Sequence, residues 1–160
     1  METRELRWIN KTNWPAGPWH DEPDKVQWPD PGTGLPCLAK RHPEQGFWCG
    51  YVGVPPGHPC HGKDCNDVDV EVHGGLTYAA PCDESADGRG ICHVAGLGEP
   101  VHVWWLGFDC AHACDYSPAP RPWTLRQGCK PFGEEYRDLG YVQDQCRQLA
   151  AQLAAKGVDA

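Results

Sequence analysis

The run from Val101 to Asp115 limits the possible folds of this chain more than any other stretch. Its first half, VHVWWLGF at residues 101–108, is apolar, β-branched and aromatic, which is typical of a buried β-strand. Its second half, DCAHACD at residues 109–115, holds two carboxylates, one imidazole and two thiols. A strand that carries ionisable side chains at its end is a rigid support for a functional site. The sequence therefore predicts a central strand with a candidate site beside it.

Four more segments have the composition of strands. They are expected near residues 35–41, 47–54, 68–73 and 76–80. The clearest alternation is in 68–73, where Val68, Val70 and Val72 are separated by acidic residues, as in a half-buried strand.

The C-terminal stretch has a different period. Apolar residues recur there at steps of three and four, which predicts an amphipathic helix from about Glu134 to Lys156. Glu134 and Glu135 would occupy its first turn, and Gly157 is a suitable stop. The apolar stripe is Leu139, Val142, Cys146, Leu149 and Leu153. We expect it to pack on the sheet; a coiled-coil dimer seam is the alternative.

These elements predict an α+β fold, with a small, mostly antiparallel sheet, one C-terminal helix and long loops rich in Pro and Gly. The length of 160 residues favours a single domain over residues 1–160. Residues 1–13 are polar and read as a loose N-terminal arm. Residues 14–33 hold five prolines among three tryptophans, which predicts an extended wrap anchored by its Trp side chains.

Composition excludes several partners. A formal net charge of −8 argues against nucleic-acid binding and against adsorption to anionic membranes. No apolar run approaches the roughly 20 residues that span a bilayer, and the first residues lack the apolar core of a secretion signal. We therefore expect a cytoplasmic protein. Most of its ten cysteines would then be small buried hydrophobic residues, with a disulfide framework as the alternative.

Several motifs resemble those of a family of uncharacterised proteins from bacteria and their phages. They are WP at 14–15, EPD at 22–24, CGYV at 49–52, HGGLTY at 73–78, WWLGFD at 104–109 with His112, and YRD at 136–138. The resemblance spans roughly residues 14–153. It supplies no activity and no catalytic residue; it implies a cytoplasmic protein and suggests carriage on mobile DNA.

The first candidate site combines His73 with Asp109 and His112, and places Asp115 at the rim or behind the ligands. Imidazole and carboxylate are usual ligands of a divalent metal ion, zinc first among them, and three protein ligands leave a position open for water. Alternatively, Asp109 caps the next turn and His112 is a structural imidazole, or the site binds a ligand or transfers protons without metal.

Further candidates carry weaker signals. A second metal site would use His58, Cys60, His61 and Cys65, although Pro59 stiffens this loop. Cys82 with Cys92 and His93 is a third group of potential ligands. Tyr78, Trp104 and Trp105 are aromatic candidates for ligand contact. Cys110 has no demonstrated cationic neighbour that would make it a nucleophile.

Two function classes follow. One is a small binding or interaction protein, such as a phage or mobile-element accessory factor that sequesters a host small molecule or a protein partner. The other is a metal-dependent hydrolase that uses His73, Asp109 and His112.

Overall fold

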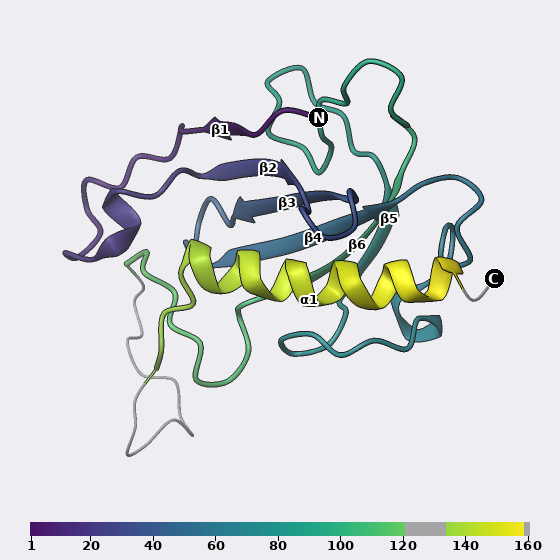
Figure 1. Ribbon diagram of the computed structural model, residues 1–160. Coiled ribbons are helices and arrows are strands. Elements are labelled where there is room, and N and C mark those ends of the chain that lie inside the picture. Colours follow the sequence, from purple (N-terminus) through teal and green to yellow (C-terminus); the bar gives the residue numbers. More distant parts are fainter. Residues whose placement is uncertain (121–133, 159–160) are drawn as a thin grey trace.

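The computed structural model describes residues 1–120 and 134–158 and confirms the α+β class. Six antiparallel strands form one sheet in the order β1-β2-β3-β4-β6-β5, and one long helix, α1, lies against it (Figure 1). The strands are β1 (Arg4–Leu6), β2 (Lys25–Pro29), β3 (Pro36–Arg41), β4 (Trp48–Val54), β5 (Tyr78–Pro81) and β6 (Trp104–Asp109); the helix is α1 (Leu139–Val158). Short 3-10 helices span Pro18–His20 and Cys65–Asp67.

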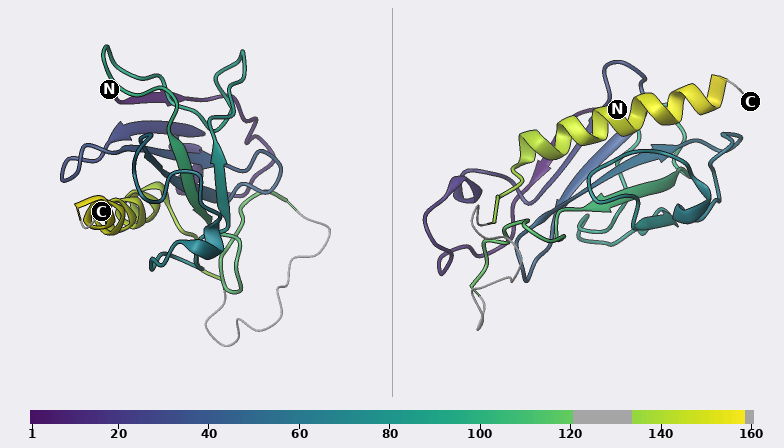
Figure 2. Two further views of the ribbon diagram at one scale, coloured as in Figure 1. Left: turned by 90° about the vertical axis from the view of Figure 1, so that its right-hand side faces the viewer. Right: turned by 90° about the horizontal axis from the view of Figure 1, so that it is seen from below.

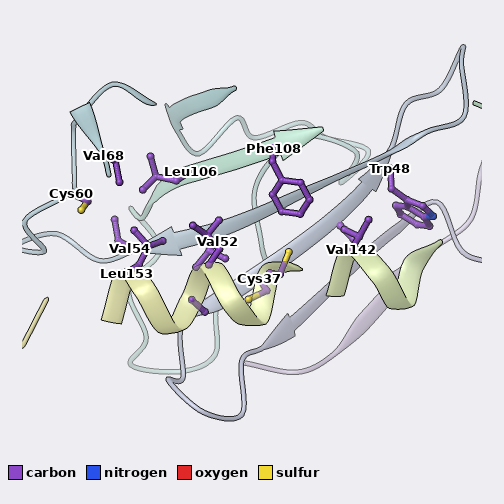
Figure 3. Packing of buried hydrophobic residues seen from close by; sticks show 14 of the residues in the cluster. Cys37, Trp48, Val52, Val54, Cys60, Val68, Leu106, Phe108, Val142 and Leu153 are labelled. Atoms are coloured by element: carbon purple, nitrogen blue, oxygen red, sulfur yellow. The ribbon is translucent and has the colours of Figure 1, made fainter. Parts of the chain in front are cut away.

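The two faces of the sheet are both covered, but by different kinds of structure. Alternate residues such as Val52, Leu106 and Phe108 belong to the same buried cluster as the apolar stripe of α1 (Figure 3). The residues between them, such as Tyr51 and Trp105, form a second buried cluster. The left view of Figure 2 looks nearly along α1 and shows the helix on one side of the sheet.

Helix α1 packs on the sheet as its period predicts. Leu149 and Leu153 are fully buried in the cluster shared with β4 and β6. The predicted start at Glu134 is wrong, because the Glu135 backbone is bonded to the 114–116 turn and the helix begins at Leu139. The N–H of Leu139 donates to Glu22, and the N–H of Tyr141 donates to Asp138; both bonds satisfy amides that a helix start leaves open. The helix also runs through Gly157 to Val158.

The N-terminal third contributes more to the sheet than expected. Within the arm predicted to be loose, β1 pairs with β2, and β2 lies between β1 and β3 although it belongs to the proline-rich wrap. Pro29 is tolerated because it is the last residue of β2. A buried ionic group fixes this region: Asp24 lies 3.4 Å from Arg41 Nε, and both side chains are almost fully buried.

The segment 68–73 is not a strand. Both edges of β6 are already paired, with β4 and β5, so this segment cannot join the sheet beside β6. Instead, two glutamine side chains of α1 bind its backbone: Gln152 exchanges two hydrogen bonds with Glu71, and Gln145 accepts one from the N–H of His73. The alternation of valines is satisfied by packing against the helix-side cluster.

The other face of the sheet is covered by residues 82–103. Lys25 and Gln27 of β2 fasten this segment through hydrogen bonds to its backbone. A disulfide joins Cys82 to Cys92 within it. By contrast, Cys37 and Cys146 are buried thiols on the helix side, as the sequence predicts for most cysteines. In the described part of the chain, no helix is long and apolar enough to cross a membrane.

Candidate functional site

The predicted site lies where β6 ends. Asp109 closes β6, the turn at 109–117 follows, and the loop at 73–77 and the start of α1 come in from elsewhere in the chain. The N–H of Cys110 donates to the carbonyl of Trp48, so the chain is still fixed to the sheet as it enters the turn. The turn is therefore held on a rigid support.

His73 lies at the centre of this site, between a carboxylate and a phenol. Its Nε2 is 2.7 Å from Asp115 Oδ2, and its Nδ1 is 2.7 Å from the Tyr141 hydroxyl oxygen. An ionised carboxylate only accepts hydrogen bonds, so in the neutral imidazole Nε2 carries the hydrogen and Nδ1 accepts from Tyr141. The three side chains thus form one directed array: phenol to imidazole to carboxylate.

Asp115 is held by more than His73. It is 1% exposed, and its Oδ2 also accepts from the N–H of His112 at 3.1 Å. Its Oδ1 accepts from Arg137 Nε at 3.2 Å. These three donors fix the position of the carboxylate. It can therefore orient the imidazole of His73 and stabilise its protonated form.

Arg137 also contacts the ring of Tyr141. Its guanidinium carbon lies 4.7 Å from the centre of the Tyr141 ring, a cation–π contact. Burial raises the pKa of the Tyr141 hydroxyl, and the positive charge of Arg137 opposes that shift. The hydroxyl is consequently a neutral proton donor at physiological pH.

A second histidine–carboxylate pair lies beside the first. His112 Nε2 is 3.4 Å from Asp109 Oδ1, and Thr77 Oγ1 donates to Asp109 Oδ2 at 2.9 Å. The side chains of His112 and Asp109 are 35% and 27% exposed, against 13% and 2% for His73 and Asp115, although the His112 Nε2 atom is itself buried. The N–H of Ala111 also donates to Asp109 Oδ1, so the carboxylate caps the turn.

The loop that carries His73 also positions His112. The two imidazole centres are 5.8 Å apart. Gly74 lies directly against the His112 ring, where a side-chain carbon would overlap the imidazole, and its φ of +68° is one that favours glycine. Gly74 therefore allows the close approach of this loop to His112.

The structure brings the first candidate residues together, but not as a ready set of metal ligands. Both ring nitrogens of His73 are already engaged, and Asp115 is its direct partner rather than a residue at the rim. Among residues 1–120 and 134–158, the one group of three ligand atoms within 4.8 Å of one another is Cys82, Glu84 and Cys92, and its two cysteines form the disulfide. A metal ion bound by His73, Asp109 and His112 stays a prediction.

The second predicted metal group is dispersed. His58 contacts the carbonyl of Leu153 through Nε2 and accepts from the N–H of Cys60 through Nδ1. His61 lies against Trp104, and Cys65 donates to the neighbouring Asp64. These contacts fasten the loop to α1 and β6, and the four side chains do not converge on one point.

The three aromatic candidates have separate surroundings. Trp105 is fully buried next to His93, and its contact with a ligand stays a prediction. Tyr78 packs edge-on against Tyr51, and Trp104 donates from Nε1 to the carbonyl of Lys63. Tyr78 and Trp104 are partly exposed, and their contact with a ligand stays a prediction.

Sequence reasoning missed Tyr141, Arg137 and Gln145. All three belong to the start of α1 or the residues just before it. Tyr141, Gln145 and Gln152 are spaced by four and seven residues, so they share one polar face of the helix beside its apolar stripe. That polar stripe could have indicated a contact of α1 with another segment, because it faces residues 71–73 and the site rather than solvent.

A separate cavity of about 340 Å³ lies on the other face of the sheet. Its walls come from β1, β2 and the loop at 83–94, and they include apolar Leu6 and Val94, acidic Asp83 and Glu84, and the almost buried His93. Burial lowers the pKa of His93, and its Nδ1 has no hydrogen-bond partner among the described residues. Lys25 at the cavity floor donates to the carbonyls of residues 88, 90 and 92.

Comparison of the chain with protein-family models, with curated proteins and with solved structures found no match.

Proposed function

We propose that this protein is a small acid–base enzyme, with Tyr141, His73 and Asp115 as its proton-transfer array. The observation that carries the proposal is the pair of 2.7 Å contacts on the two ring nitrogens of His73. A reactive hydroxyl bonded to a base, with the base oriented by a third group, is the arrangement used for activated hydroxyls in many enzymes. Tyrosine can fill the hydroxyl position as a proton donor or acceptor.

The array gives a defined proton path. When the Tyr141 oxygen takes a proton from the water that attacks a substrate ester, its own proton passes to His73 Nδ1. The resulting imidazolium is stabilised by Asp115. As the ester bond breaks, the proton returns through Tyr141 to the leaving oxygen, so Tyr141 is the catalytic residue and Asp115 is a positioning residue.

The charges around Tyr141 indicate the substrate class. Arg137 lies over the ring, and its second carboxylate partner, Glu135, is 72% exposed and thus weakly held. A small substrate with an anionic or carbonyl oxygen would find a positive group here. Carboxyl and phosphate esters are therefore the first substrates to test.

The experiment is a screen of chromogenic carboxyl and phosphate esters in the presence of EDTA. Tyr141→Phe and His73→Gln should lose at least 90% of any wild-type turnover while keeping the far-UV circular dichroism spectrum. Tyr78→Phe is the matched control, since this tyrosine lies outside the array. Turnover by Tyr141→Phe at the wild-type rate would refute the proposal.

The metal-dependent hydrolase remains the competing form of this proposal. It requires His73 to release Tyr141 or Asp115 before one of its nitrogens could bind an ion. The same screen separates the two forms, because metal dependence predicts activity with added zinc or manganese and none with EDTA.

A second candidate function is small-molecule binding, and the 340 Å³ cavity favours it. That volume is within the usual range for ligand pockets. A protein that sequesters a small molecule would use this cavity and not the His73 array. A ligand found by thermal-shift screening should then lose affinity in Val94→Glu and keep it in His73→Gln.

A further inference from the structure

Three potential metal ligands meet on the face of the sheet opposite α1. Cys82 follows directly after β5, and Cys92 lies ten residues later in the loop that covers this face. The Sγ atoms of both cysteines and a carboxylate oxygen of Glu84 lie within 4.8 Å of one another. Thiolate and carboxylate are both zinc ligands. As long as the disulfide is closed, however, neither sulfur is a thiolate.

The loop is organised by contacts that do not depend on the disulfide. Lys25 Nζ donates to three loop carbonyls, including that of Cys92 at 2.9 Å. Gln27 both accepts from the N–H of Val94 and donates to its carbonyl. The N–H of Asp83 donates to the carbonyl of Ile91, which holds the two ends of the loop together. These bonds would keep Cys82 and Cys92 adjacent after reduction.

We propose that reduction of the Cys82–Cys92 disulfide converts this loop into a zinc site, with the two thiolates and Glu84 as ligands and a water as the fourth. A dithiol or two thiol molecules supply the two electrons and two protons that cleave the S–S bond, and they are themselves oxidised to a disulfide. Zn²⁺ then displaces the two thiol protons as the Zn–S bonds form. The site is redox-switched, because the same sulfurs cannot hold zinc and each other.

The required movement is small. Two thiolates on a tetrahedral zinc ion, each at about 2.3 Å, lie about 3.8 Å apart. The Cα atoms of Cys82 and Cys92 are 4.8 Å apart. Rotation of the two side chains can therefore separate the sulfurs without breaking the hydrogen bonds of the loop. Glu84 is exposed and free to turn toward the ion.

The charge balance also favours a dication. Two thiolates and one carboxylate carry a charge of −3. Asp83 and Asp87, which line the adjoining cavity, add to the negative potential. The opposing charges are the ammonium of Lys25, which is held by backbone carbonyls, Arg4, which also lines the cavity, and Arg89, which pairs with Asp87.

The test uses Co²⁺ as a spectroscopic substitute for zinc, with the full chain in reduced and oxidised forms. Reduced wild-type protein should bind about one Co²⁺ with the near-ultraviolet thiolate-to-cobalt band, and Zn²⁺ should displace it. Cys82→Ser and Cys92→Ser should lose the band, and Glu84→Gln should weaken binding at least tenfold. Cys65→Ser is the matched control and should bind as the wild type does.

Alkylation followed by mass spectrometry gives an independent readout that does not require the variants to fold. In reduced wild-type protein, zinc should protect Cys82 and Cys92 from alkylation and leave Cys65 reactive. Equal Co²⁺ binding by oxidised and reduced protein would overturn the proposal, as would equal alkylation of Cys82 with and without zinc. Activity at Tyr141 is not part of either measurement, so the result is independent of the proposed function.

Discussion

His73 Nε2 lies 2.7 Å from Asp115 Oδ2, although 42 residues separate the two in the sequence. The contact joins the loop after residue 72 to the turn after β6. Asp115 also holds Arg137 and the His112 backbone, so one buried carboxylate connects three segments of the chain. The site and the local stability of the fold therefore depend on the same side chain.

Asp115→Ala should destabilise the protein by about 3–5 kcal/mol, because it leaves buried donors and a guanidinium without their partner. Asp109→Ala is the matched control, since its carboxylate is 27% exposed, and it should cost about 1 kcal/mol. Urea denaturation of both variants at pH 7 measures the difference. Equal losses would mean that the burial of Asp115 has no energetic consequence.

Gly74→Ala should cost more than Gly75→Ala. Both glycines have positive φ, so each substitution carries about 1–2 kcal/mol of backbone strain. Only at Gly74 would the new methyl group also overlap His112, whereas Gly75 has open space. The extra loss, about 1–3 kcal/mol of overpacking, should appear in thermal unfolding together with a shift of the His112 ring signals in NMR spectra. Identical unfolding curves would contradict the close approach.

Gln152→Ala should loosen the segment at 68–73 without unfolding the protein. Gln152 exchanges two hydrogen bonds with the Glu71 backbone, and no strand pairs with this segment. Amide exchange at Glu71 should therefore accelerate at least tenfold. Gln148→Ala, one turn away on the same helix, should leave that amide protected as in the wild type.

Leu149→Ala should destabilise the fold by about 2–5 kcal/mol, because Leu149 is fully buried between α1 and the sheet. Chemical denaturation compared with Gln148→Ala measures the cost on the same turn of the helix. A change below about 0.5 kcal/mol would indicate that the stripe contributes to an interface and not to the core.

Stability should fall as the pH rises above about 9 under reducing conditions. Burial raises the pKa of the Cys37, Cys110 and Cys146 thiols above the ordinary value of 9.0. The folded state therefore keeps protons that the unfolded state loses, at about 1.4 kcal/mol per pH unit for each thiol. Lys25 acts in the opposite direction between about pH 8 and its ordinary value of 10.5, but it is a single group. Urea titrations from pH 8 to 10.5 should show the fall, with a shallower slope in Cys146→Ala; a flat profile would contradict it.

The helix and most of the sheet could be predicted because their signals are local. The steps between Val142, Cys146, Leu149 and Leu153 follow the period of a helix, and that side faces the sheet. The apolar runs of β3, β4 and β6 gave strands within a few residues of their bounds. Residues 68–73 have an equally clear alternation, yet they form no strand, and their backbone is bonded to Gln145 and Gln152 of α1 instead.

The candidate site also combines features that have a local signal in the sequence with features that depend on distant segments. The sequence by itself placed Asp109, His112 and Asp115 in one turn after a strand, since short-range geometry brings a turn back on itself. Tertiary structure alone decided that Asp115 is the partner of His73, that Tyr141 completes the array, and that Cys82 is bonded to Cys92. The physical reason is that hydrogen bonds and disulfides depend on distances of a few ångströms between segments far apart in the chain. Those distances follow from how α1 and the loops pack on the two faces of the sheet, and no local pattern of residues encodes them.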